Sequence, residues 1–105
     1  MLDLNEKLYE ELLAGDKPLL VEYWAPGCVY CRRIVVAMEQ VAKNHEGRLV
    51  VGRINIDAFP ALAERERIEV VPTLVLYHKG DALGSAVAPE SRSRIEEFLE
   101  DYLEN

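Results

Sequence analysis

The chain has 105 residues, half of them hydrophobic, which is enough apolar material for one core in a single domain spanning residues 1–105. The 19 acidic residues outnumber the 12 Lys and Arg, and the net charge of −7 argues against general nucleic-acid binding and against attraction to anionic membranes. We find no apolar run of membrane-spanning length and no secretion signal, so we expect a cytoplasmic protein.

The first half of the chain predicts a helix, a strand and a second helix. Asp3 and Asn5 can cap the first helix, which carries leucines on one face and ends at Gly15. The run from Leu19 to Trp24 is nearly all apolar, which is typical of a strand covered on both faces. A long helix is then expected from about Cys28 to Asn44.

The second half predicts a strand, a short helix, a hairpin and a final helix. The strand covers residues 48–56, and the short helix at 61–67 follows a cap at Asp57. A hairpin joins strands at 73–77 and 82–87, and Ser91 caps the last helix. This order predicts an α/β sandwich of three layers, in which helices flank a central mixed sheet of about four strands.

The two cysteines, Cys28 and Cys31, lie where the first strand passes into the long helix. The amides and dipole of a helix N-terminus stabilise a thiolate, so the more exposed Cys28 is expected to be the nucleophile and the deeper Cys31 the resolving thiol. Two inert buried thiols, half of a zinc site, or a cluster shared between two chains are the alternatives. His45 and His78 lack the close spacing of zinc ligands, so we expect neither a metal nor another cofactor.

Two further features surround this dithiol in the predicted sheet. Glu22 is a carboxylate in a buried strand, where it must be paired or protonated. A plain ion pair with Arg53 on a neighbouring strand, or a strand that is more exposed than its sequence suggests, would explain it structurally. A functional explanation is that Glu22 exchanges a proton with Cys31, and the structural and functional explanations can both hold. The other feature is Pro72 at the entry to an apolar strand, which is either a simple strand start or the second residue of a cis Val71–Pro72 bond.

Together these segments resemble the thioredoxin family over nearly the whole chain. The resemblance is carried by four collinear motifs: Val21-Glu22-Tyr23-Trp24-Ala25-Pro26 leading into Cys28-Val29-Tyr30-Cys31-Arg32, Val51-Gly52-Arg53-Ile54-Asn55-Ile56-Asp57, Val71-Pro72-Thr73-Leu74, and Tyr77-His78-Lys79-Gly80. It implies a mixed sheet with helices on both faces and a first cysteine that attacks substrate disulfides. It also implies that Pro72 is cis and lies against the dithiol, that Val71 offers backbone hydrogen bonds to a bound peptide, and that Glu22 with Arg53 assists proton transfer.

The chain departs from the family pattern around the dithiol. Gly27 stands where the family usually has tryptophan, and Val29-Tyr30 replaces the usual Gly-Pro. Four other departures are Glu22 for aspartate, Arg53 for lysine, Val36 for the proline that kinks the active-site helix, and Ala88 for a late glycine. Few residues precede the first helix, so the family's opening strand is expected to be reduced or absent.

The resemblance implies a thiol–disulfide oxidoreductase that reduces protein disulfides, with an isomerase or oxidase, or a non-catalytic partner-binding module, as alternatives. Its partners would be protein disulfides and a thioredoxin-reductase-like electron donor, and the protein would be a monomer that binds neither nucleic acid nor membranes. The expected catalytic residues are Cys28, Cys31, Glu22 and Arg53. The expected substrate-binding residues are Trp24, Gly27, Val29, Tyr30, Val71 and Pro72.

Overall fold

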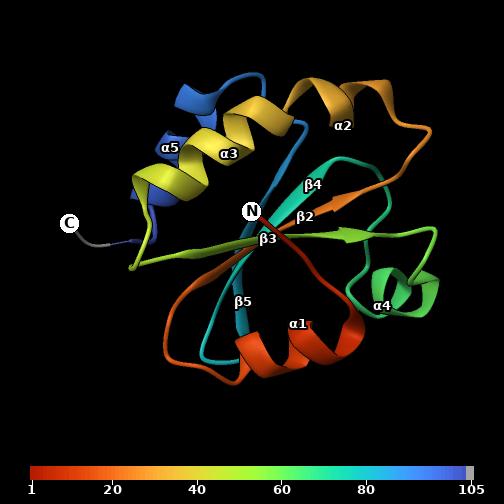
Figure 1. Cartoon of the computed structure of the whole chain (residues 1–105), viewed down its shortest axis with the longest axis horizontal. Helices are drawn as coiled ribbons and strands as arrows, with labels where there is room; N and C mark the ends of the chain where they lie inside the picture. Colours follow the sequence, from red (N-terminus) through yellow and green to blue (C-terminus); the bar gives the residue numbers. More distant parts are fainter. Residues whose placement is uncertain (104–105) are drawn as a thin grey trace.

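A computed structural model describes residues 1–103, and within this range a five-stranded mixed sheet lies between two layers of helices (Figure 1). The strand order is β1-β3-β2-β4-β5. The strands are β1 (Leu2–Asp3), β2 (Leu19–Trp24), β3 (Val50–Asn55), β4 (Thr73–His78) and β5 (Asp81–Val87). The strands β1, β3 and β2 run parallel, whereas β4 and β5 are antiparallel to their neighbours. The predicted mixed sheet is therefore confirmed, with a fifth strand that is the expected opening strand reduced to two residues.

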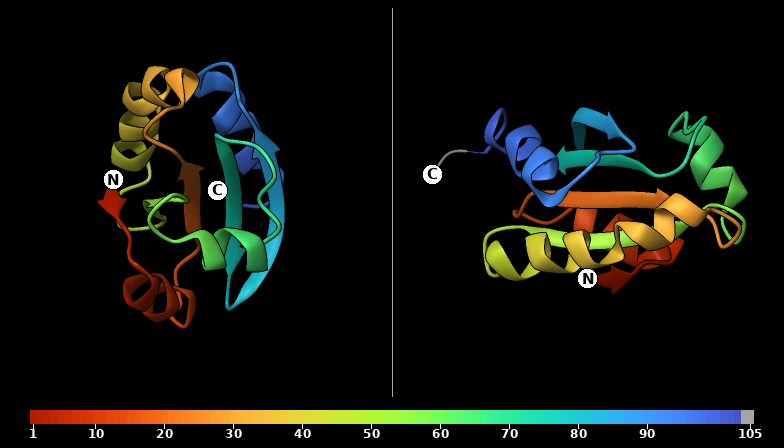
Figure 2. Two further views of the ribbon diagram at one scale, coloured as in Figure 1. Left: turned by 90° about the vertical axis from the view of Figure 1, so that its right-hand side faces the viewer. Right: turned by 90° about the horizontal axis from the view of Figure 1, so that it is seen from above.

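Five helices cover the two faces of the sheet within residues 1–103 (Figure 2). They are α1 (Glu6–Leu13), α2 (Val29–Arg33), α3 (Val35–Asn44), α4 (Pro60–Arg65) and α5 (Arg92–Glu100). Helices α3 and α5 pack on one face, where Met38 and Leu99 join the same core cluster. Helices α1 and α4 pack on the other face, where Tyr9 and Leu62 join a second cluster. None of these helices combines the length and the apolar character that spanning a bilayer requires.

The central strand β2 is covered on both faces, as its sequence predicted. Side chains alternate between the two faces of a strand. Leu20 accordingly belongs to the cluster under α3 and α5, and Val21 to the cluster under α1 and α4. Glu22 follows two residues after Leu20 and thus faces the α3 and α5 side, which is the side on which α2 begins.

The predicted long helix from Cys28 to Asn44 is wrong in one respect, because it is broken into α2 and α3 at Ile34. The backbone of Ile34 has φ −91° and ψ 0°, outside the regular helical range. The break occurs at Ile34-Val35-Val36, and such β-branched residues have low helix propensity. The bend is stabilised by burial of the Ile34 side chain in the core, and it forms here without a proline.

The helix caps agree with the sequence at two positions and differ at a third. Asn5 accepts the backbone N–H of Leu8 at the start of α1, and Ser91 accepts that of Arg94 at the start of α5. The predicted cap at Asp57 is wrong. Asn55 accepts the N–H of Asp57 instead and ends β3, and α4 begins at Pro60 without a side-chain cap.

Candidate active site

The two cysteines form a disulfide at the start of α2, with their Cα atoms 5.3 Å apart. Cys28 is the residue that precedes the helix, and its Sγ accepts the backbone N–H of Cys31 at 3.1 Å. Cys28 is partly exposed, whereas only 2% of Cys31 is exposed. The predicted arrangement of an outer and an inner sulfur at a helix start is therefore confirmed.

A tight turn after β2 presents Cys28 to solvent. The backbone N–H of Cys28 donates to the carbonyl of Ala25, and the Arg32 guanidinium donates to the carbonyl of Pro26. Gly27 in this turn is exposed, and a Cβ added there would meet nothing within 4 Å. The position at which the family carries tryptophan is thus open space, which leaves the approach to Cys28 uncovered.

The loop before β4 lies against the outer sulfur. The Val71–Pro72 peptide bond is cis, as expected, and the carbonyl oxygen of Val71 lies 3.8 Å from Cys28 Sγ. The carbonyl of Pro72 in turn accepts the backbone N–H of Ala88 at 2.9 Å. The loop at Val71 and Pro72 therefore contacts Cys28 on one side and Ala88, at the end of β5, on the other.

The two residues between the cysteines point in different directions. Val29 is 56% exposed. Tyr30 is partly buried against the core, and its hydroxyl donates to the carbonyl of Pro89 at 3.0 Å. Tyr30 therefore connects α2 to the loop before α5 through this hydrogen bond.

Glu22 is fully buried on the face of β2 that α2 and α3 cover. Neither of its carboxylate oxygens has a hydrogen-bond partner among residues 1–103. Burial raises the pKa of the Glu22 carboxyl from 4.5 to about 7, and the nearby positive charge of Arg53 offsets part of that rise. The chain thus carries a buried carboxyl that changes its protonation near neutral pH.

The predicted ion pair between Glu22 and Arg53 is wrong, although the two residues are partners in the register of β2 and β3. The Arg53 Nε lies 3.3 Å from a carboxylate oxygen of Asp3, and the guanidinium carbon lies 3.7 Å above the ring of Trp24. With these contacts the Arg53 side chain is 18% exposed, and its Nε is buried without a hydrogen-bond partner within residues 1–103. No local sequence pattern indicates Asp3 as a partner of Arg53, because the two residues come together only when β1 pairs with β3.

A hydrogen-bonded group of tyrosines on the opposite face of the sheet was not anticipated. The hydroxyls of Tyr23 and Tyr77 lie 2.7 Å apart, and that of Tyr77 donates to Glu66 at 2.7 Å. Tyr9 also donates to Glu66, at 3.2 Å. Burial raises the pKa of all three phenols, so the group consists of neutral hydroxyls around one carboxylate.

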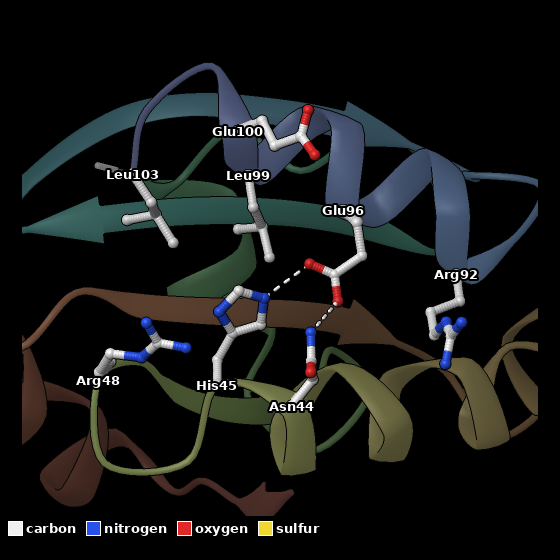
Figure 3. Close-up of a pocket in the computed structure, with 8 residues that line it drawn as sticks. All are labelled: Asn44, His45, Arg48, Arg92, Glu96, Leu99, Glu100 and Leu103. Carbon is white, nitrogen blue, oxygen red and sulfur yellow. Dashed lines mark hydrogen bonds and ion pairs between the residues drawn. The ribbon is translucent and has the colours of Figure 1, made fainter. Parts of the chain in front are cut away.

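The histidines lie away from the dithiol. His45, just after α3, contacts Glu96 of α5 at 2.6 Å and lines a pocket between the two helices (Figure 3). His78 contacts the carbonyl of Asp16 at the end of β4. Within residues 1–103, no three His, Cys, Asp or Glu side chains gather in the manner of metal ligands.

Comparison with known proteins gives consistent matches over almost the whole chain. A family model described as Thioredoxin matches residues 1–101. Thioredoxin 1 of Nostoc sp. is 31% identical over 94 residues, covering 90% of this chain and 88% of the relative. Thioredoxin of Buchnera aphidicola subsp. Baizongia pistaciae is 31% identical over 104 residues, covering 98% and 95%. Thioredoxin of Alicyclobacillus acidocaldarius is 29% identical over 101 residues, covering 96% of each chain.

Proposed function

The chain belongs to the thioredoxin family as a thiol–disulfide oxidoreductase that reduces protein disulfides, and we propose the part that each of its residues takes in that reaction. The observation that carries the proposal is the position of the two sulfurs. Cys28 is partly exposed at a helix start, and Cys31 is buried directly behind it. An exposed thiol beside helical amides is the better nucleophile, because those amides stabilise its thiolate.

In the first step, the Cys28 thiolate attacks one sulfur of a substrate disulfide. A mixed disulfide forms between Cys28 and the substrate, and the other substrate sulfur leaves as a thiolate. In the second step, the Cys31 thiol gives up its proton and its sulfur attacks Cys28 Sγ. The Cys28–Cys31 disulfide forms, the second substrate thiolate leaves, and two electrons have passed from the protein to the substrate.

Glu22 is the group we propose to accept the Cys31 proton. Cys31 lies one turn before Ile34, which packs in the same cluster as Leu20, and Glu22 follows Leu20 on that face of β2. A general base works best when its pKa lies near the operating pH, and burial brings Glu22 to that range. Arg53 contributes a positive charge that limits how far the pKa rises.

The substrate peptide is proposed to lie over Cys28 and along the backbone of Val71 and Pro72. Gly27 and the exposed Val29 leave this surface open and partly apolar. Trp24 and Tyr30 would support this surface from behind. The Arg53 guanidinium stacks on the ring of Trp24, and the Tyr30 hydroxyl donates to the carbonyl of Pro89.

The remaining parts of the proposal concern the setting of the reaction. Residues 1–105 would act as one domain and as a monomer, in the cytoplasm, where thiols are kept reduced. The electron donor would be a thioredoxin-reductase-like protein, and the substrates would be protein disulfides. No nucleic acid or membrane is expected to take part, in keeping with the net charge of −7.

The roles of the two cysteines are tested by insulin-disulfide reduction with Cys28→Ser and Cys31→Ser. Cys28→Ser should form no adduct, whereas Cys31→Ser should accumulate a mixed disulfide with substrate that mass spectrometry detects. Neither variant should turn over, and Val36→Ala, altered at an exposed position of α3, should keep full activity. A stable adduct on Cys31 of the Cys28→Ser variant would reverse the assignment.

A further inference from the structure

Three charged residues occupy one row across the first three strands of the sheet. The register pairs Asp3 of β1 with Arg53 of β3, and Arg53 with Glu22 of β2. Residues paired in this way point to the same face of a sheet. An acid, a base and a second acid therefore lie side by side on the face that α3 covers.

The row runs from solvent into the core. The side chain of Asp3 is 87% exposed, that of Arg53 is 18% exposed, and Glu22 is fully buried. Arg53 thus has a carboxylate on each side, yet its ion pair is with Asp3, and its guanidinium also stacks on Trp24. Both oxygens of Glu22 and the buried Nε of Arg53 are without a hydrogen-bond partner in residues 1–103, so Arg53 and Asp3 interact as an ion pair without a hydrogen bond.

We propose that Asp3 is a positioning residue that holds Arg53 away from Glu22 and so keeps the Glu22 carboxyl able to take up the Cys31 proton. This inference rests on the proposed role of Glu22. If Asp3 released Arg53, the guanidinium would be free to turn toward Glu22, where an opposite charge at close range strongly favours the ionised carboxylate. Glu22 would then be a weaker base toward the Cys31 thiol.

Burial has the largest effect on the Glu22 carboxyl, and among the charged groups around it Arg53 is the one that acts on its charge. In the same row, β4 and β5 present Leu74 and Ala86, which are apolar. Helices α3 and α5 contribute apolar side chains to the cluster on this face, Tyr30 of α2 packs against it, and Cys31 of α2 is buried. The arginines of α2 are exposed, and Arg32 is bound to the carbonyl of Pro26.

The groups around Arg53 supply a matched control. A surface pocket is lined by Asp3, Trp24 and Arg53 and also by Glu39 of α3. Glu39 carries the same charge as Asp3, but its ion pair is with the amino group of Met1, at 3.3 Å. Removing the charge of Glu39 therefore changes the field of this pocket without releasing Arg53.

The test is the titration of the Glu22 carboxyl by carbon-13 NMR in the native protein, Asp3→Asn, Asp3→Glu and Glu39→Gln. Asp3→Asn should lower the Glu22 midpoint by about one pH unit, a tenfold loss of proton affinity. Asp3→Glu should restore the native midpoint, and Glu39→Gln should leave it within about 0.2 unit. An Asp3→Asn midpoint that is equal to the native one, is higher, or matches that of Glu39→Gln would overturn the proposal.

Exchange kinetics separate this inference from the proposed role of Glu22. The acid limb of the pH–rate profile for release of the mixed disulfide should move to lower pH in Asp3→Asn and stay in place in Glu39→Gln. Glu22→Gln should slow that release and abolish the limb. If Glu22→Gln leaves the rate unchanged, the role of Glu22 in proton transfer is wrong, while the NMR midpoint still decides whether Asp3 controls Arg53.

Discussion

Glu22→Gln is expected to gain stability relative to the native protein as the pH rises, although it changes a residue of the proposed active site. The Glu22 carboxyl is buried, and neither oxygen has a hydrogen-bond partner within residues 1–103. Burial raises its pKa to about 7 in the folded state, against 4.5 for an unperturbed carboxyl. Between these values the folded chain holds a proton that the unfolded chain has lost.

The sign and size of the effect follow from proton linkage. Where the unfolded state binds fewer protons than the folded state, the free energy of unfolding falls as pH rises. The penalty is absent below pH 4.5, grows through the interval up to about pH 7, and is complete above it. At ~1.4 kcal/mol per pH unit, the interval between the two pKa values corresponds to a loss of unfolding free energy of about 3 kcal/mol.

The assay is urea unfolding of the oxidised native protein and of Glu22→Gln at a series of pH values from 4.5 to 8.5. The difference in unfolding free energy should shift in favour of the variant by up to about 3 kcal/mol across this range. Any packing cost of the buried amide is the same at each pH and cancels in the comparison. Glu97→Gln, at an exposed position of α5, should show no such shift. A native-minus-variant difference that stays constant with pH would refute the reasoning.

Three further substitutions have expected effects on stability. Ala88 has φ +44°, a left-handed conformation that costs a residue with a Cβ about 1 kcal/mol, so Ala88→Gly should raise the urea midpoint, and a lower midpoint would contradict this strain. Tyr30→Phe removes the hydroxyl that donates to Pro89 and should cost about 1 kcal/mol, seen as a fall of several degrees in Tm; an unchanged Tm would mean that the bond contributes nothing. Tyr77→Phe removes a buried donor to Glu66 and should lower the unfolding free energy by about 1–3 kcal/mol in urea. A loss no larger than the one caused by a Tyr→Phe substitution at an exposed position would contradict this contribution of the hydrogen bond.

Features set by local sequence were predicted correctly. Asn5 and Ser91 cap helices because a side-chain oxygen needs only the amides three residues ahead. The dithiol lies at a helix start because an apolar strand and a helical pattern meet at Cys28. The hairpin forms at Lys79 and Gly80, whose positive φ values suit a tight turn.

Features that depend on competition between distant partners were not predicted. The Arg53 guanidinium has three possible partners, Glu22, Asp3 and Trp24. Its contacts with Asp3 and Trp24 depend on the positions of β1 and β2 on the two sides of β3. The break at Ile34 likewise depends on the core that buries this side chain. The hydrogen bond from Tyr30 to the carbonyl of Pro89 could not be predicted either, because nothing near Tyr30 in sequence indicates that Pro89 lies beside it.

The reduction potential of the Cys28–Cys31 pair tests the central claim most directly. Protein-disulfide reductants such as thioredoxin have potentials of about −270 mV, whereas isomerases have potentials of about −180 mV and strong oxidants have higher ones. Equilibration with glutathione or dithiothreitol buffers, read by mass spectrometry of the alkylated thiols, gives the value for this chain. We expect a potential of about −230 mV or lower. A value of about −180 mV or higher would contradict a role as a reductant of protein disulfides.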